Sequence, residues 1–207
     1  DVFGFANEGN SEIIYATQVS SSIADEYGFG SDFWNWFVGD DSKADFPVDS
    51  DLVAAFDASD ATGATDLRRA VTLDAAGTTA IKFPKDGGNG GEHDWIEIRL
   101  GDVILLYAEA LNENGDTAGA LTQLNKIRNR AGLANSTATS QADVRTAILN
   151  ERRLELAFEG HRWDDLVRTN TVDAEMGTTV NSNYYLFPIP ISEILATGGV
   201  ITQNAGY

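Results

Sequence analysis

The sequence contains no cysteine, and this absence excludes three kinds of site. A disulfide framework, a thiolate zinc site and a cysteine nucleophile all require this residue. Histidine is scarce too, since His93 and His161 are the only two, and their separation rules out a metal-binding pair on one helical turn. No apolar run approaches the length that spans a bilayer, so we expect any membrane attachment to come from residues outside this chain or from a partner.

Basic residues are few. Lysine and arginine together number 14 against 32 acidic residues, which gives a net charge of −18. Residues 1–95 hold 18 acids and 5 bases, a net −13, while residues 96–207 hold 14 acids and 9 bases, a net −5. Because no basic stripe is present to neutralise phosphates, the composition argues against binding to nucleic acid or to an anionic lipid surface. Neutral substrates such as glycans are compatible with this charge.

The chain changes character near Trp95. Residues 1–95 are punctuated by Gly, Asp and Ser and predict a loop-rich segment, whereas residues 96–207 show helical periodicity. Within the second part, Gly115 and Asp116 are residue types that end one helix and begin the next. We therefore expect a helical hairpin over residues 96–131. Its apolar positions are Ile96, Leu100, Val103, Tyr107 and Leu111 on one face of the first helix, then Ala118, Leu121, Leu124 and Ile127 on the second.

The expected hairpin resembles one tetratricopeptide-type unit, which cannot bury both of its faces, since stable arrays need about three or more units. A third helix is expected after Ser140, with Asp143 as its capping acid, to end at Gly160. The last part of the chain contains Pro188 and Pro190 and predicts an irregular strap over the helices. The fold class that follows is mainly α with long irregular loops.

Three glutamates at a spacing of four, Glu151, Glu155 and Glu159, fall on one face of the expected third helix. A pair of carboxylates is what a glycosidase needs, provided that one of them stays protonated. Like charges at this spacing repel unless bases lie between them, so a structural ion-pair lattice is the competing interpretation. We favour the lattice, because a carboxylate with a matched cation stays ionised and cannot act as a general acid. Its expected members are Arg128, Glu151, Arg153, Glu155, Glu159 and Arg162, with Arg130 as a further candidate base.

Aromatic residues crowd the segment from Tyr27 to Phe37, interleaved with Gly, Ser, Asp and Asn. If this segment is extended, Trp34 and Trp36 point the same way. Aromatic rings with neighbouring amides complement sugars, which present apolar C–H faces edged with hydroxyl groups. The candidate ligand-binding residues are therefore Tyr27, Phe33, Trp34, Asn35 and Trp36. The alternative is that these rings anchor a long loop onto the helices.

Two other kinds of site are disfavoured. Several aspartates between Asp40 and Asp51 supply the oxygens that calcium prefers, but their spacing fits no EF-hand loop. An acidic surface is the simpler interpretation, and calcium binding stays open. The glycines from Gly87 to Gly91 lack the Lys-Ser/Thr and the helix start of a phosphate loop. We therefore expect no cofactor, no resident metal and no catalytic residue.

A series of motifs follows in a recognisable order along the second part of the chain. Leu106-Tyr-Ala-Glu-Ala-Leu111 precedes Arg128-Asn-Arg-Ala-Gly-Leu133, and Asn150-Glu-Arg-Arg-Leu-Glu-Leu156 opens a longer block that ends at Arg168. Leu186-Phe-Pro-Ile-Pro190 and Gln203-Asn-Ala-Gly-Tyr207 come last. Together they resemble the C-terminal portion of a SusD/RagB-type protein, with Ala205 where that family usually has proline. Roughly the N-terminal half of such a protein is expected to be missing, including its lipidated cysteine.

The resemblance implies a SusD-like helical fold with a tetratricopeptide-type helix pair, in which the Glu-Arg-Arg-x-Glu-Leu block is part of the scaffold. It also implies a surface lipoprotein of the outer membrane of Bacteroidetes that captures oligosaccharides without cleaving them and caps a TonB-dependent, SusC-like transporter. Residues 1–95 would then be the ligand-facing segment and residues 96–207 the helical region. Two alternatives remain: a helical-repeat scaffold that binds proteins, and a glycosidase that uses the paired carboxylates.

Overall fold

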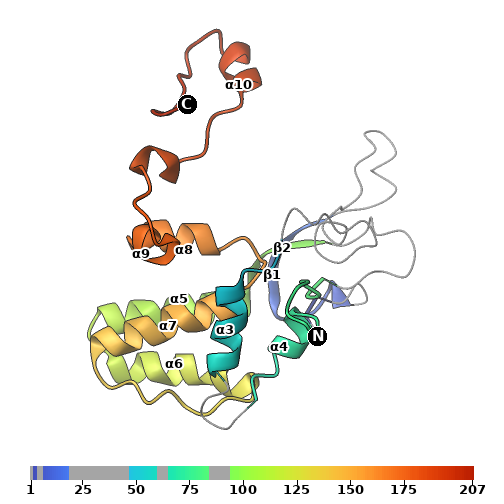
Figure 1. Ribbon diagram of the computed structural model, residues 1–207, viewed down its shortest axis with the longest axis vertical. Coiled ribbons are helices and arrows are strands. Elements are labelled where there is room, and N and C mark those ends of the chain that lie inside the picture. Colours follow the sequence, from blue (N-terminus) through green and yellow to red (C-terminus); the bar gives the residue numbers. More distant parts are fainter. Residues whose placement is uncertain (1, 4–6, 19–46, 60–64, 84–93) are drawn as a thin grey trace. The chain divides into compact units, whose positions relative to one another are not determined.

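The structure, a computed structural model, describes residues 2–3, 7–18, 47–59, 65–83 and 94–207. Within these ranges helices dominate and a two-stranded sheet is the only sheet, so the expected mainly α fold is confirmed (Figure 1). The chain forms two compact units, residues 1–160 and residues 161–207, which are described separately. None of the described helices is both long and apolar enough to cross a membrane.

Three helices form the centre of the first unit. They are α5 (Leu100–Glu113), α6 (Thr117–Arg130) and α7 (Gln141–Glu155), and they pack on one another (Figure 1). Leu105 and Leu124 are fully buried between them. Ala108 and Ala120 are also fully buried, and their small side chains let α5 and α6 approach closely.

Both predicted N-caps are present. The Asp116 carboxylate accepts a hydrogen bond of 2.8 Å from the Gly119 N–H at the start of α6. The Ser140 hydroxyl accepts one of 3.1 Å from the Asp143 N–H at the start of α7. Each side chain satisfies a backbone donor that has no partner within its helix, which fixes where the helix begins.

The beginning of the hairpin differs from the expectation. Trp95–Arg99 is a strand, β2, that pairs antiparallel with β1 (Ile13–Thr17), and α5 begins only at Leu100. The predicted helix from Ile96 is therefore wrong. The alternation in Trp-Ile-Glu-Ile-Arg suits a strand, and a distant segment supplies its hydrogen-bonding partner. The pairing sets Ile13 opposite Arg99 and so brings the residue before Ile13, Glu12, next to the Arg99 side chain.

Most of the apolar face predicted for the first helix lies at the surface of α5, although Leu111 at its end packs against the core. Leu100, Val103 and Tyr107 have exposed fractions of 45%, 40% and 53%, whereas Leu105 and Ala108 on the opposite face have 0%. Because alanines in this segment permit close packing, the sequence did not decide which face of the helix meets its neighbours. The face that packs on α6 and α7 is the one with the smaller side chains.

Helix α7 ends at Glu155, five residues before the predicted end at Gly160. In a continuing helix, the Glu155 carbonyl would accept the N–H of residue 159. It instead accepts a hydrogen bond of 2.9 Å from the Lys82 Nζ, while the Glu159 N–H donates to the Leu156 carbonyl. Phe158 then takes a positive φ of 66°, which turns the chain. The prediction that Glu159 lies on the same helix as Glu151 is therefore wrong.

Two short helices complete the first unit. Helix α3 (Ser50–Ser59) buries Phe56 in a second, smaller core with Leu73 and Leu154. Helix α4 (Arg69–Thr72) follows the segment that carries Arg68, and this arginine points toward the end of α7.

The second unit consists of α8 (Arg162–Arg168), α9 (Val172–Met176), the 3₁₀ helix η3 (Ser182–Tyr185) and α10 (Ile191–Ala196). Leu166 and Val172 are buried, but η3 and α10 bury no residue. The end of the chain is held by side-chain hydrogen bonds instead. The Gln203 amide donates to the Ile189 carbonyl at 2.9 Å and accepts from the Ile189 N–H at 2.8 Å. The expected division of roles between residues 1–95 and 96–207 stays a prediction.

Candidate functional site

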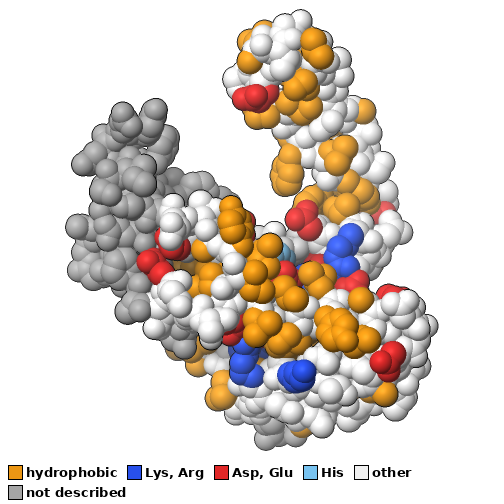
Figure 2. Space-filling view, turned by 180° about the vertical axis from the view of Figure 1, so that it is seen from behind, with side chains coloured by type: hydrophobic (Ala, Val, Ile, Leu, Met, Phe, Trp, Pro, Cys, Tyr) orange, Lys and Arg blue, Asp and Glu red, His pale blue; other side chains and the backbone are white. Residues whose placement is uncertain are grey.

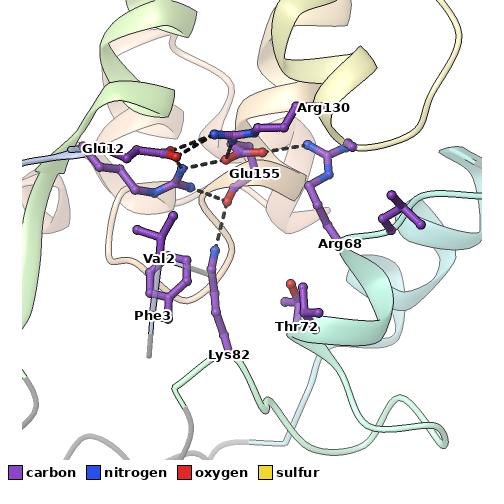
Figure 3. Close-up of a pocket in the computed structure, with 12 residues that line it drawn as sticks. Val2, Phe3, Glu12, Arg68, Thr72, Lys82, Arg130 and Glu155 are labelled. Atoms are coloured by element: carbon purple, nitrogen blue, oxygen red, sulfur yellow. Dashed lines mark hydrogen bonds and ion pairs between the residues drawn. The ribbon is translucent and has the colours of Figure 1, made fainter. Parts of the chain in front are cut away.

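A cavity of about 490 Å³ opens beside the end of α7 (Figure 3). Its lining comes from segments that are far apart in the sequence, which meet around a group of charged side chains. The lining includes two exposed apolar residues, Leu67 and Val71, together with six charged side chains. The lining residues are Val2, Phe3, Glu12, Leu67, Arg68, Val71, Thr72, Lys82, Arg99, Arg130, Ala131 and Glu155.

Glu155 is the carboxylate on which most of these cations converge. It accepts hydrogen bonds from Arg99 Nη1 at 2.6 Å and from Arg68 Nη1 at 3.1 Å, and Arg130 Nη2 also donates to it. Its side chain is only 4% exposed. Burial by itself would raise the pKa of Glu155, but the charges of Arg99, Arg130 and Arg68 lower that pKa to about 2. Glu155 is therefore ionised at neutral pH.

Glu159 binds two deeply buried cations, Arg99 and Lys82. Arg99 Nε donates to Oε2 at 2.6 Å, and Lys82 Nζ lies 2.5 Å from Oε1. Burial would raise the pKa of Glu159, but Lys82 and Arg99 together lower it. Burial also lowers the pKa of Lys82, an effect that the charge of Glu159 opposes.

The same two cations bind backbone carbonyls at the C-terminal end of α7. Lys82 Nζ donates to the Glu155 and Ala157 carbonyls at 2.9 and 3.0 Å, and Arg99 Nη2 donates to the Glu155 carbonyl at 2.8 Å. The last carbonyls of a helix have no partner within the helix and carry partial negative charge. Lys82 and Arg99 therefore act as a buried C-cap for α7.

Glu151 lies one helical turn before Glu155 and binds two other arginines. Arg128 Nη1 donates a hydrogen bond to Glu151 Oε2 at 3.0 Å. Arg68 Nη1 lies 2.7 Å from Glu151 Oε1 and forms an ion pair with it, but the angles do not make a hydrogen bond. Arg68 is also held by Asp66, at 2.7 Å between Nη2 and Oδ2. Burial raises the pKa of Glu151, and Arg68 and Arg128 oppose that rise.

The charges of this cluster balance. Five cations face five carboxylates, and each cation contacts at least one of them. An acid catalyst needs a protonated carboxyl group that a substrate can reach, but Glu155 and Glu159 are held ionised, and the Glu151 side chain is 1% exposed. This geometry favours a structural role over acid–base catalysis. We call this group the charged cluster: Arg68, Lys82, Arg99, Arg128, Arg130, Glu12, Asp66, Glu151, Glu155 and Glu159.

The structure brings together four of the six residues expected in the lattice, namely Arg128, Glu151, Glu155 and Glu159. Arg153 lies half-buried on α7. Arg162 begins α8 in the second unit, where its guanidinium contacts Glu175. That the lattice has a purely structural role stays a prediction.

Sequence reasoning missed Glu12, Asp66, Arg68, Lys82 and Arg99. One signal was available, because Arg68 and Lys82 are two of only five bases among the first 95 residues. Isolated bases in an acidic segment need carboxylate partners when they are buried. Arg68 has one partner nearby, Asp66, but the glutamate partners of Arg68 and Lys82 on and after α7 lie more than 70 positions away, so spacing gives no hint of which ones they are.

The candidate ligand-binding residues Tyr27, Phe33, Trp34, Asn35 and Trp36 lie outside the described residues, as do Asp40, Asp41 and Asp45. Asp49 is described, and its carboxylate accepts the Asp51 N–H at 2.7 Å at the start of α3. Among the residues that the structure describes, no three His, Cys, Asp or Glu side chains are grouped so as to hold a metal ion.

Comparison with known proteins decides the family. The model of the SusD family matches residues 78–183, slightly more than half of the chain and including the helical hairpin and α7. The chain belongs to the SusD family. Its curated SusD relatives include the SusD-like protein P2 of Formosa agariphila, with 30% identity over 70% of this chain and 38% of that protein. The starch-binding protein SusD of Bacteroides thetaiotaomicron is 35% identical over 53% of this chain and 21% of its own length.

Solved SusD structures share the fold. A SusD superfamily protein from Parabacteroides distasonis superposes with a TM-score of 0.72 at 21% identity, over 98% of this chain and 51% of that one. A laminarin-binding SusD-like protein superposes with a TM-score of 0.56 at 31% identity, over 78% of this chain and 38% of that one. The chain therefore spans well under two thirds of the length of the SusD relatives that it matches.

Proposed function

We propose that this chain is part of a non-catalytic oligosaccharide-binding protein of the cell surface. The observation that carries the proposal is the similarity to the laminarin-binding SusD-like protein, at 31% identity over 78% of this chain. The similarity to the starch-binding SusD protein supports the same class of ligand. A fold can serve many functions, so the class of ligand rests on these relatives and on the residues of the site, and the fold alone does not establish it.

The described geometry supports binding without cleavage. The carboxylates of the charged cluster are matched by cations, and the one whose pKa is raised is buried beneath two arginines. A retaining or inverting glycosidase needs two carboxyl groups that flank a reachable glycosidic bond. The charged cluster is better suited to hold the loops of residues 1–95 against the helices, since it joins Glu12, Arg68 and Lys82 to the end of α7.

We place the sugar-binding platform in the aromatic segment, on Tyr27, Phe33, Trp34, Asn35 and Trp36. In this proposal residues 1–95 face the ligand, and residues 96–207, with the hairpin over residues 96–131, form the helical region that supports them. A stacked aromatic ring recognises the apolar face of a sugar, and amide groups bind its hydroxyls.

The parent protein, in this proposal, lies on the outer membrane and delivers its oligosaccharide to a TonB-dependent, SusC-like transporter. Attachment would come from a lipidated N-terminus of that parent. Calcium is not required by any described group.

The test is affinity electrophoresis of the chain in gels that contain a panel of glycans, with Trp34→Ala/Trp36→Ala as the variant. We expect retardation by at least one glycan and its loss in the variant. Phe187→Ala is the matched control, because Phe187 is also aromatic and is 75% exposed in the second unit. Retardation that survives the double substitution would place the platform elsewhere.

A second candidate function is a helical-repeat scaffold that binds proteins. The exposed apolar face of α5, with Leu100, Val103, Leu106 and Tyr107, favours it. Under this alternative, Leu106→Gln/Tyr107→Gln would abolish capture of the partner protein, and Trp34→Ala/Trp36→Ala would not. If a glycan retards the chain and the retardation is lost in Trp34→Ala/Trp36→Ala, oligosaccharide binding is supported over the protein-binding scaffold.

A further inference from the structure

We infer that the oligosaccharide bound by this chain is uncharged, and that glycans carrying sulfate or carboxylate groups are rejected. The inference rests on the proposed function and adds to it the chemical class of the ligand. Proteins recognise anionic groups with arginine and lysine side chains and with the free N–H groups at helix N-termini. In the part of the chain that the structure describes, most of these bases already contact a carboxylate of the protein, and the N-termini of the three long helices are already occupied by the protein's own groups.

The cations are engaged first. The described residues include twelve of the 14 bases, and at least ten of these twelve contact a carboxylate. At the cavity, Arg99 and Arg130 each contact Glu12 and Glu155, and Figure 3 shows Arg130 beside these two carboxylates. A ligand anion that entered this cavity would have to displace a carboxylate of the protein. The ten bases are Arg68, Arg69, Lys82, Arg99, Arg128, Arg130, Arg145, Arg152, Arg162 and Arg168.

The N-termini of the three long helices are occupied as well. Helix α5 has no side-chain cap, but Asp102 lies in its first turn and the Leu100 N–H donates to the Glu12 carbonyl at 2.8 Å. At the start of α6, the carboxylate of Asp116 takes the Gly119 N–H. At the start of α7, the Ser140 hydroxyl takes the Asp143 N–H, and the Asp143 carboxylate lies in the first turn, 2.6 Å from that hydroxyl. An acid in the first turn already uses the favourable helix dipole, so a sulfate or carboxylate gains little there.

The residues outside the described ranges add more acids than bases, so they do not make the chain attractive to anions. The residues outside the described ranges contain two of the bases, Lys43 and Lys85, and ten acids. A ligand anion that approaches the chain therefore meets a net charge of −18. Repulsion of this kind acts over about one Debye length, roughly 10 Å at 0.1 M salt, and weakens as salt is added. The ten acids are Asp1, Asp25, Glu26, Asp32, Asp40, Asp41, Asp45, Asp60, Asp86 and Glu92.

The experiment compares one oligosaccharide that the chain binds with its sulfated derivative, which has the same backbone, by titration calorimetry at low and high salt. We expect the affinity for the neutral oligosaccharide to be independent of salt. The sulfated derivative should bind at least about tenfold more weakly at roughly 0.01 M salt, and this gap should narrow at roughly 1 M salt, where the Debye length is about 3 Å. Lys126→Gln is the control, since it removes an exposed base whose Nζ donates to Gln123, and it should change neither affinity.

The possible outcomes test two separate claims, namely that the ligand is uncharged and that the chain binds glycans at all. Tighter binding of the sulfated derivative that weakens with salt would overturn the inference and leave glycan binding standing. A gap that does not respond to salt would also overturn it, because discrimination would then be steric. A loss of affinity in Lys126→Gln would show that the chain does offer a base to an anion. Failure of every neutral and charged glycan to bind would overturn the proposed function itself.

Discussion

At the scale of single residues, Glu155 holds the charged cluster together because three arginines converge on its carboxylate. Replacing it by Gln keeps its shape but removes a counter-charge that three guanidinium groups share, so the cluster is left with one buried positive charge in excess. Breaking a buried ion pair from one side typically costs about 3–5 kcal/mol. We expect Glu155→Gln to lower the free energy of unfolding by an amount in that range, measured by urea denaturation.

The matched control is Glu113→Gln. Glu113 also binds an arginine, Arg145, but both side chains are more than 40% exposed, and an exposed pair contributes at most about 1 kcal/mol. If the two substitutions had equal effects, the cluster would not contribute more to stability than a surface ion pair.

The pKa of Glu155 leads to a prediction for acid pH. This pKa is about 2 in the folded chain against an ordinary value of 4.5, so the stabilisation is complete above pH 4.5 and is lost as the pH falls toward 2. The shift corresponds to about 3 kcal/mol. The difference in unfolding free energy between the natural chain and Glu155→Gln should therefore shrink over this pH window. A difference that stays constant across the window would contradict the depressed pKa.

At this scale the sequence predicted only part of the cluster. The spacing of Glu151, Glu155 and Glu159 indicated an ion-pair lattice, and Arg128 is among the bases that reach it. Arg99 and Lys82 could not be predicted as partners, because strand pairing positions both of them. Arg99 ends the strand that pairs with β1, and Lys82 follows the bridge between Leu73 and Ala80, and neither pairing leaves a short-range pattern. Glu159 reaches the cluster from a turn, although the pattern placed it on a helix.

At the scale of elements, α5 has two apolar faces, and only one of them packs within the described part of the chain. Leu105 is fully buried, whereas its neighbour Leu106 is 40% exposed. Truncating a buried leucine costs about 2–5 kcal/mol, while surface substitutions usually stay within about 0.5 kcal/mol. We therefore expect Leu105→Ala to destabilise the chain strongly and Leu106→Ala to leave the urea midpoint nearly unchanged. Equal losses would mean that the outer face is covered within this chain.

The positions of the three long helices could be predicted because their caps and periodicity are local signals. Asp116 and Ser140 mark the starts of α6 and α7 in the sequence and cap them in the structure. The inner face of α5 could not be chosen in advance, since periodicity identifies faces but not which one meets a neighbour. Strand β2 could not be told from a first helical turn, because its partner strand lies more than 75 positions earlier.

At the scale of the whole molecule, the chain is a mainly α member of the SusD family whose charged cluster ties early segments of the chain to helix α7. The match to the Parabacteroides distasonis structure includes 98% of this chain but only 51% of that protein. The activities of the full-length relatives are therefore proposed for this chain and are not established by the match. The central claim is that the molecule binds an oligosaccharide and leaves it intact.

The most direct measurement is calorimetric titration of the chain with an oligosaccharide, followed by chromatography of the same sample for cleavage products. Our account predicts saturable binding, an unchanged oligosaccharide, and loss of binding in Trp34→Ala/Trp36→Ala with the fold retained by circular dichroism. Cleavage products that disappear in Glu151→Gln or Glu155→Gln would contradict it, and so would a well-folded chain that binds no glycan.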